Sequence, residues 1–296
     1  KSNANKYLKE QKYPIVIKAD GLASGKGVII ANSIEEAVLS VNQIFDGKFG
    51  EAGKTIVIEE FLEGTEASFF AISDGNIIIP FTTAQDYKKA YDNNEGPNTG
   101  GMGAFSPARN IDKNLEKKIM DLIITPTFNA LKNEGIIYKG ILYAGLMIKD
   151  NFQKLIEYNV RFGDPECQVL AMRLGAQLLD LLLDCANGDI EKSIVNWAND
   201  SAISIVMAAK GYPGNYEKGS VIRNVESAER EEGIQVFHAG TINHNNELLA
   251  NGGRVLNVTG RAKTLKDARD LAYKAVQLID WDEGFYRKDI GWRALG

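Results

Sequence analysis

The sequence predicts a mixed α/β protein of two or three domains. Short runs rich in β-branched residues, at 14–20, 28–31, 54–60 and 138–149, have the composition of strands. Other segments, at 34–45, 111–133 and 264–279, are typical of helices. The chain has 296 residues, of which 44% are hydrophobic and 25% charged, which is long enough and apolar enough to form substantial cores.

The charge balance and the rare residue types exclude several classes of function. The net charge is −5 with no block of Lys and Arg, which argues against a nucleic-acid partner. No apolar run is long enough for a membrane span and no signal peptide opens the chain, so we expect a cytoplasmic protein. Two Cys residues indicate a reducing compartment. Only His238 and His244 carry imidazole, so chemistry in the main body should use carboxylates, Lys, Arg and backbone amides.

The first strand, 14–20, and the second, 28–31, are joined by a glycine-rich turn. Glycines let backbone N–H groups approach a phosphate, and Lys26 in the turn and Lys18 on the strand add positive charge. The turn is not a Walker loop, because Gly27 stands in place of Ser or Thr and a strand follows. An ordinary glycine hairpin with a solvent-facing Lys remains an alternative. Ser33 then caps a helix, and the strand 54–60 follows it.

A long stretch without periodicity, residues 85–108, follows a hairpin over 66–83. A structureless segment of this length inside a domain is usually functional. It contains Asp86 and Lys88, and then the string Asn-Thr-Gly-Gly-Met-Gly at 98–103. Consecutive backbone amides at 99–103 are expected to form an anion-binding nest.

The densest group of polar residues lies at 157–168. The strand at 153–160 should pair with the strand at 138–149 and place Glu157, Asn159 and Arg161 on one face. The opposite face carries apolar residues suited to a core: Ile156, Tyr158, Val160 and Phe162. Glu and Asn offer oxygen ligands for Mg²⁺, and Arg can hold a carboxylate or phosphate, although a merely solvated polar face is the alternative. Residues 163–165 end the strand, and 166–186 have helical spacing.

From residue 202 the chain changes character. Short strands and turns lead to a helix at 264–279, which Thr264 is expected to cap. We expect a separate C-terminal unit in which both histidines are structural.

Two strings resemble one family. The string Arg-Phe-Gly-Asp-Pro-Glu-Cys-Gln-Val at 161–169 and the string at 98–103 resemble the signatures of phosphoribosylamine–glycine ligase, an ATP-grasp enzyme. The resemblance runs from residue 14 to the end. It implies an ATP-grasp fold with a small β-rich lid (1–60), a larger catalytic subdomain (61–200) and a C-terminal β-rich domain (201–296). The lid is expected to be mobile and to close over nucleotide.

The family also carries an α/β domain ahead of the lid, for which residues 1–13 leave no room. The resemblance therefore implies a fragment of low ligase activity, since a substrate pocket at a domain interface would lose one wall.

The resemblance assigns the nucleotide site to the first part of the chain. Lys18 and Lys26 would meet the phosphates of ATP, Glu59 or Glu60 the adenine amino group, and Glu66 the ribose. The implied ATP-binding residues are Lys18, Gly25, Lys26, Gly27, Glu59, Glu60, Phe61, Leu62 and Glu66. The alternative is that these glutamates form a solvated rim.

Further roles follow from the same resemblance. Glu157 and Asn159 would bind Mg²⁺ or Mn²⁺, and Arg161 and Asp164 would be catalytic residues that orient glycine or its acyl phosphate. Relatives often place an acidic metal ligand where this sequence has Gly145, so the metal shell is thinner here and the number of metal ions stays open. The substrates would be glycine and 5-phosphoribosylamine, and the enzyme would be a monomer. The implied substrate-binding residues are Asp86, Lys88, Asn98, Thr99, Gly100, Gly101, Met102, Arg161, Asp164 and Pro165.

The implied reaction joins glycine to 5-phosphoribosylamine through a glycyl phosphate, with ATP cleaved to ADP and phosphate, in purine biosynthesis. Two other readings stay open. Another ATP-grasp carboxylate–amine ligase or a carboxylase is disfavoured by the two strings. A non-catalytic nucleotide-binding module is disfavoured because Glu157 and Asn159 are both present.

Overall fold

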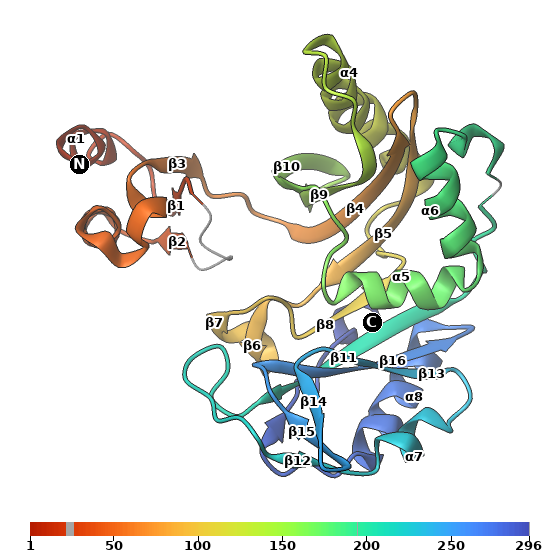
Figure 1. Cartoon of the computed structure of the whole chain (residues 1–296). Coiled ribbons are helices and arrows are strands. Elements are labelled where there is room, and N and C mark those ends of the chain that lie inside the picture. The colour runs from red at the N-terminus through yellow and green to blue at the C-terminus, as the bar shows by residue number, and fades with distance from the viewer. Residues whose placement is uncertain (22–26, 194, 296) are drawn as a thin grey trace. The chain divides into compact units, whose positions relative to one another are not determined.

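The computed structural model describes residues 1–21, 27–193 and 195–295 (Figure 1). The chain separates into two compact units, Lys1–Glu63 and Gly64–Gly296, and each is described by itself. In the described part of the chain, no helix is both long enough and apolar enough to cross a membrane.

The first unit is a three-stranded antiparallel sheet packed against two helices. The strand order is β2 (Val28–Ala31), β1 (Ile15–Ala19), β3 (Ile56–Glu60), and the helices are α1 (Ser2–Leu8) and α2 (Ile34–Gln43). Alternate residues of β1, Ile15 and Ile17, are buried against Leu8 and Val41. The Ser33 hydroxyl accepts the Glu36 N–H at 3.3 Å, which confirms the predicted helix cap. A π-helical turn, Ile44–Lys48, and a 3₁₀ turn, Gly50–Gly53, lead from α2 towards β3.

The second unit is built on one long antiparallel sheet. In the described residues its strand order is β10 (Phe152–Asn159), β9 (Lys139–Lys149), β4 (Thr65–Asp74), β5 (Ile78–Asp86), β8 (Gly103–Ser106), β11 (Ser201–Ala209), β16 (Arg254–Ala262), β13 (Ile234–His238), with β17 (Gly284–Phe285) beside β11. The predicted hairpin of β9 and β10 is confirmed. It turns at Asp150 and Asn151, whose φ angles of 51° and 58° are typical of tight hairpin turns.

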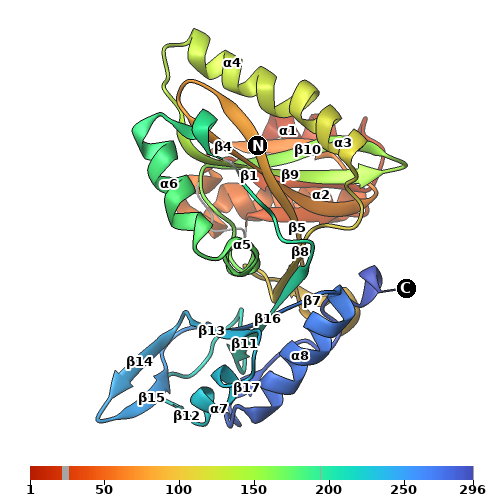
Figure 2. The ribbon, with the colours of Figure 1, turned by 90° about the vertical axis from the view of Figure 1, so that its right-hand side faces the viewer.

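Helices cover both faces of β4 and β9, as Figure 2 shows. On one face lie α3 (Lys113–Ile119), a π-helical turn (Met120–Ile124) and α4 (Thr125–Asn133), and on the other lie α5 (Glu166–Leu174) and α6 (Gln177–Asn187). Phe69 faces the first group and its neighbour Phe70 faces the second, because successive strand side chains alternate. Pro126 falls at the start of α4, after the π-helical turn. A single helix over 166–186 is wrong, because Gly175, with φ of 59°, ends α5.

The strands β11, β16 and β13 form a further core with α7 (Val225–Glu229) and α8 (Leu265–Leu278). The Thr264 hydroxyl accepts the Asp267 N–H at 3.1 Å, so the predicted cap of α8 is confirmed. A small sheet, β12 (Val221–Ile222), β15 (Glu247–Ala250), β14 (Thr241–His244), stands beside this core. Since β8 pairs with β11, one sheet continues across residue 200. The predicted domain limits at 60 and 200 stay predictions.

Residues 85–108 are not the structureless loop that the sequence predicted. They contain the hairpin of β6 (Lys89–Tyr91) and β7 (Glu95–Asn98), with a 3₁₀ turn at Asp92–Asn94, and then β8. The fully buried Arg287 holds this hairpin: its guanidinium donates to the Lys89 carbonyl and to Asn94 Oδ1, each at 3.0 Å. The segment had no visible periodicity because its strands are only three or four residues long.

Candidate active site

Four adjacent strands bring the predicted polar residues to one face of the sheet. Glu157 on β10 lies opposite Gly145 on β9, and Gly145 lies opposite Ser68 on β4. Ser68 in turn lies opposite Ala84 on β5, two residues before Asp86. Residues directly opposite one another, and those two positions along a strand, share a face. Carboxylates that are far apart in the sequence therefore project on the same side of the sheet as α5.

The centre of this face is an acidic cluster around one lysine. Lys88 Nζ lies 2.5 Å from Glu66 Oε2. Burial alone would lower the pKa of Lys88, but the carboxylates of Asp86, Glu66 and Glu157 raise it above its ordinary value. Burial, reinforced by the charges of Glu166 and Glu66 and opposed by Lys88, raises the pKa of Asp86 to about 7. Asp86 can therefore exchange a proton near neutral pH.

Glu166 belongs to this cluster, although the sequence did not mark it as a site residue. Its Oε1 accepts hydrogen bonds from the Tyr143 hydroxyl at 2.8 Å and from Ser68 Oγ at 3.2 Å. Burial raises the pKa of the Glu166 carboxyl in spite of these donors. A Cβ atom on Gly163 would lie 2.4 Å from this carboxyl group, so the glycine of the string at 161–169 makes room for it. A glutamate at the start of an amphipathic helix looks like a solvated residue in a sequence, which is why it was missed.

Glu157 and Asn159 lie next to each other on β10, as predicted. Asn159 Nδ2 lies 3.5 Å from Glu157 Oε1, and Glu157 is exposed. No cluster of three or more His, Cys, Asp or Glu residues suited to a metal ion occurs within the described residues. The residue opposite Glu157 is Gly145, whose added Cβ would lie 3.5 Å from Glu157 Cγ. Because glycine has no side chain, this position supplies no metal-binding group. The pair fits an ion such as Mg²⁺, which takes one or two protein oxygens and completes its shell with substrate phosphates and water.

The structure does not pair the two predicted catalytic residues with each other. The Arg161 guanidinium donates to the Phe162 carbonyl at 2.7 Å. Both oxygens of the Asp164 carboxylate have other partners: Oδ2 pairs with Arg254 at 2.9 Å and Oδ1 accepts from Gln168 at 3.1 Å. Arg254 is a second residue that the sequence did not single out, because its partners are about 90 and 150 positions away.

The alternation predicted beyond residue 159 is also wrong. Strand β10 ends at Asn159, and Val160, expected in the core, is 74% exposed. Phe162 packs against Phe70 and Phe81 on the side of α5. Once the strand ends, the period of two no longer decides which side a residue faces.

The glycine-rich string at 98–103 does not form the predicted anion-binding nest, because its amides have acceptors within the protein. Thr99 N–H donates to the Lys88 carbonyl (2.7 Å), Gly100 N–H to the Tyr212 hydroxyl (3.1 Å), Gly101 N–H to Thr99 Oγ1 (3.0 Å) and Met102 N–H to the Tyr87 carbonyl (2.8 Å). The Met102 side chain is fully buried, whereas Asn98, at the end of β7, is exposed. The string is therefore a hydrogen-bonded wall, and its exposed residues, Asn98 and Gly100, remain for a ligand.

The two signature strings contact each other. Gly101 has a φ of 117°, and a Cβ atom there would lie 2.5 Å from Pro165 Cδ. Only glycine fits both the backbone angle and the space. This contact places Gly101 and Pro165, both predicted to bind substrate, in one wall.

Two predicted nucleotide residues of the first unit, Lys18 and Glu59, lie on the open face of its sheet, opposite the buried Ile15 and Ile17. Lys18 Nζ lies 2.5 Å from Glu59 Oε2. The register places Val28 and Val57 on either side of Lys18, and both valines are exposed. Gly27 accepts the Ala19 N–H at 2.9 Å, while Gly25 and Lys26 lie outside the described residues. The face combines an apolar surface with a lysine, which suits an aromatic base and a phosphate.

Two further members of the predicted nucleotide set follow β3. Phe61 is partly exposed, at 36%, and Leu62 is half-buried. Glu60 ends the strand.

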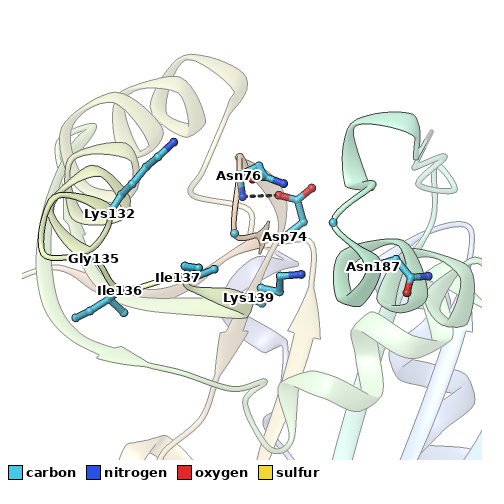
Figure 3. A pocket seen from close by; sticks show the side chains of 10 residues that line it. Asp74, Asn76, Lys132, Gly135, Ile136, Ile137, Lys139 and Asn187 are labelled. Atoms are coloured by element: carbon cyan, nitrogen blue, oxygen red, sulfur yellow. Dashed lines mark hydrogen bonds between the residues drawn. The ribbon is translucent and has the colours of Figure 1, made fainter.

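A cavity of about 480 Å³ lies elsewhere on the second unit, at the opposite end of β4 (Figure 3). Asp74 lines it and accepts the N–H groups of Asn76 and Ile77 at 2.8 and 3.0 Å, which fixes the turn between β4 and β5. Along an extended strand, Asp74 is roughly 26 Å from Glu66. This cavity is not part of the candidate site.

Comparisons with known proteins identify the family that this arrangement resembles. Residues 1–167 match the model described as phosphoribosylglycinamide synthetase, ATP-grasp (A) domain, and residues 202–293 match the C domain of the same synthetase. The chain is 54% identical to the chloroplastic phosphoribosylamine–glycine ligase of Arabidopsis thaliana and 50% identical to the phosphoribosylamine–glycine ligase of Brucella melitensis, over 99% of its length in each case. It spans 56% of the Arabidopsis relative and 68% of the Brucella relative.

Comparison with solved structures gives the same family. The crystal structure of phosphoribosylamine–glycine ligase from Thermotoga maritima superimposes with a TM-score of 0.87 and 36% identity, covering 97% of this chain and 71% of that one. The biotin carboxylase domain of 2-oxoglutarate carboxylase from Hydrogenobacter thermophilus has a TM-score of 0.70 at 18% identity, covering 96% of this chain and 61% of that one. This second likeness shows the fold alone. The predicted ATP-grasp fold is confirmed.

Proposed function

We propose, because this chain belongs to the phosphoribosylglycinamide synthetase (phosphoribosylamine–glycine ligase) family, that it joins glycine to 5-phosphoribosylamine at the expense of ATP. The products are N1-(5-phospho-D-ribosyl)glycinamide, ADP and phosphate, in de novo purine biosynthesis. The observation that carries the proposal is the contact of Gly101 with Pro165, which joins the two family strings into one wall.

The first step forms glycyl phosphate. An oxygen of the glycine carboxylate attacks the γ-phosphorus, the bond to the bridging oxygen breaks, and ADP leaves. Such a transfer needs positioning and neutralisation of charge more than a protein nucleophile. Lys18 and Lys26 would meet the phosphates, and Mg²⁺ or Mn²⁺ held by Glu157 and Asn159 would supply further positive charge.

The second step forms the amide. The amine nitrogen of 5-phosphoribosylamine attacks the carbonyl carbon of glycyl phosphate, the carbon–oxygen bond to phosphate breaks, and the nitrogen loses a proton. Asp86 would accept this proton, because it lies at the end of β5 in the acidic cluster with Lys88 and burial raises its carboxyl pKa to about 7. Lys88 beside it would meet an anionic group of the substrate. Arg161 and Asp164 would orient glycine or the acyl phosphate.

The remaining roles complete the proposal. Glu59 or Glu60, Phe61 and Leu62 would hold adenine, and Glu66 would share its carboxylate between Lys88 and the ribose hydroxyls. The substrate wall would present Asn98, Thr99 and Gly100, with Gly101, Met102 and Pro165 buried behind them. A monomeric, cytoplasmic enzyme is part of this proposal.

The test is an assay of ADP release by the purified full-length protein, with the product identified by mass spectrometry. We expect ADP release to require glycine and the glycinamide product to require freshly prepared 5-phosphoribosylamine. The Glu157→Gln protein is the matched control and should release little ADP. ADP release that depends on bicarbonate instead of glycine would indicate a carboxylase and overturn the proposal.

A further inference from the structure

Arg254, the first residue of β16, lies between the two signature strings. Its Nη1 donates to the carbonyl oxygens of Gly100, Gly101 and Asp164, at 3.0, 3.4 and 2.6 Å. Its Nη2 donates to Asp164 Oδ2 at 2.9 Å. The side chain is largely buried, with 20% of its surface exposed. A guanidinium presents its donors in a rigid planar fork, so these four bonds fix the relative positions of the acceptors.

The residues around Arg254 pack closely against its guanidinium. A Cβ atom on Gly100 would lie 2.8 Å from Arg254 Nη2, so the glycine allows the guanidinium to approach the backbone. The Tyr212 hydroxyl accepts the Gly100 N–H at 3.1 Å. Both Tyr212 and Arg254 belong to the C-terminal part of the chain. That part therefore completes the wall formed by the strings at 98–103 and 161–169.

We propose that Arg254 is a positioning residue of the ligase site: it orients the Asp164 carboxylate and fixes the Gly100–Gly101 segment against it. The inference rests on the proposed function. Without the guanidinium, Gln168, at 3.1 Å, would be the one side chain of the described residues still bonded to the Asp164 carboxylate. The carbonyls of Gly100 and Asp164 would lose a charged donor. Substrates oriented by this wall would then be misplaced, while the open face of the first sheet, with Lys18, would be unchanged.

The test compares Arg254→Lys with Arg261→Lys in the full-length protein. Arg261 is a matched control on the same strand: its guanidinium also pairs with a carboxylate, Asp200, and also donates to a carbonyl, that of Met172 at 2.7 Å. We expect Arg254→Lys to raise the KM for glycine or 5-phosphoribosylamine about tenfold or more and to change the KM for ATP less than about twofold. Arg261→Lys should lower thermal stability and leave each KM unchanged.

A second measurement separates this inference from the proposed function. Hydrogen exchange of the 98–102 amides should be faster in Arg254→Lys than in the wild type and unchanged in Arg261→Lys. Added guanidinium should partly restore the KM of Arg254→Ala. If the wild type shows no glycine-dependent ADP release, the proposed function fails. Hydrogen exchange of the 98–102 amides then still tests whether Arg254 fixes the Gly100–Gly101 segment. Unchanged exchange and unchanged KM values in Arg254→Lys would overturn the role of Arg254.

Discussion

The Tyr143 hydroxyl donates a hydrogen bond to Glu166 Oε1 at 2.8 Å, and this contact joins β9 to the first residue of α5. It fixes the helix that follows the string at 161–169 to the sheet that carries the acidic cluster. Tyr143→Phe removes one of the two side-chain donors to the buried Glu166 carboxyl group, so it should destabilise the protein by about 1–2 kcal/mol. Urea unfolding measures this. Tyr91→Phe, at a tyrosine that is 49% exposed, is the control and should cost less than about 0.5 kcal/mol.

Asp86 should make the protein less stable at neutral pH than at acid pH. Its carboxyl pKa is about 7 in the folded chain and near 3.8 when unfolded, so between these values the folded state binds more protons. The free energy of unfolding attributable to Asp86 therefore falls as the pH rises from 4 to 7. Asp86→Asn removes this dependence and should be more stable than the wild type at pH 8, on the order of 2 kcal/mol or more, because ionising the buried carboxyl costs free energy even beside Lys88. Urea midpoints at pH 5 and pH 8 should differ less in the variant, and an equal pH dependence in both proteins would refute this.

Gly101→Ala should disrupt the wall formed by the two strings. The added Cβ meets Pro165 at 2.5 Å, and the backbone has a φ of 117°. Gly140 is the matched control, because it has a φ of 121° but nothing within 4 Å of an added Cβ. We expect a cost of about 1–2 kcal/mol for Gly140→Ala from backbone strain alone, and at least about 1 kcal/mol more for Gly101→Ala, with loss of ligase activity. An equal loss of unfolding free energy in both variants would show that Pro165 moves aside at little energetic cost.

Glu157→Gln and Asn159→Ala should affect turnover much more than folding. Glu157 is exposed, and the two side chains contact each other at 3.5 Å. The unfolding free energy should change by less than about 0.5 kcal/mol, whereas metal-dependent ADP formation should fall about 100-fold or more. Raising the Mg²⁺ concentration should partly restore turnover in Asn159→Ala. Normal turnover at low Mg²⁺ in that variant would exclude the metal assignment.

The elements that the sequence predicted well are those whose cause is local. The β9–β10 hairpin, the caps at Ser33 and Thr264, and the neighbouring pair Glu157 and Asn159 each depend on residues within a few positions. The ATP-grasp fold came from the resemblance of two strings, and not from periodicity.

What could not be predicted depends on residues far apart in the chain. The amides at 99–102 were expected to bind an anion, yet Tyr212 and Lys88 supply acceptors that only the fold brings near. Glu166 and Arg254 looked like ordinary surface residues, because their partners are far away along the chain. The fold, and not spacing along the chain, decides such contacts.

The most direct test of the proposed ligase is the fate of the carboxylate oxygens of glycine. Glycine labelled with oxygen-18 on its carboxylate, ATP and 5-phosphoribosylamine would be incubated with the full-length protein, and the products analysed by mass spectrometry. If glycyl phosphate forms, the released phosphate carries one labelled oxygen and the glycinamide product keeps the other. Unlabelled phosphate formed together with glycinamide, or ADP formed without any glycinamide, would contradict the account.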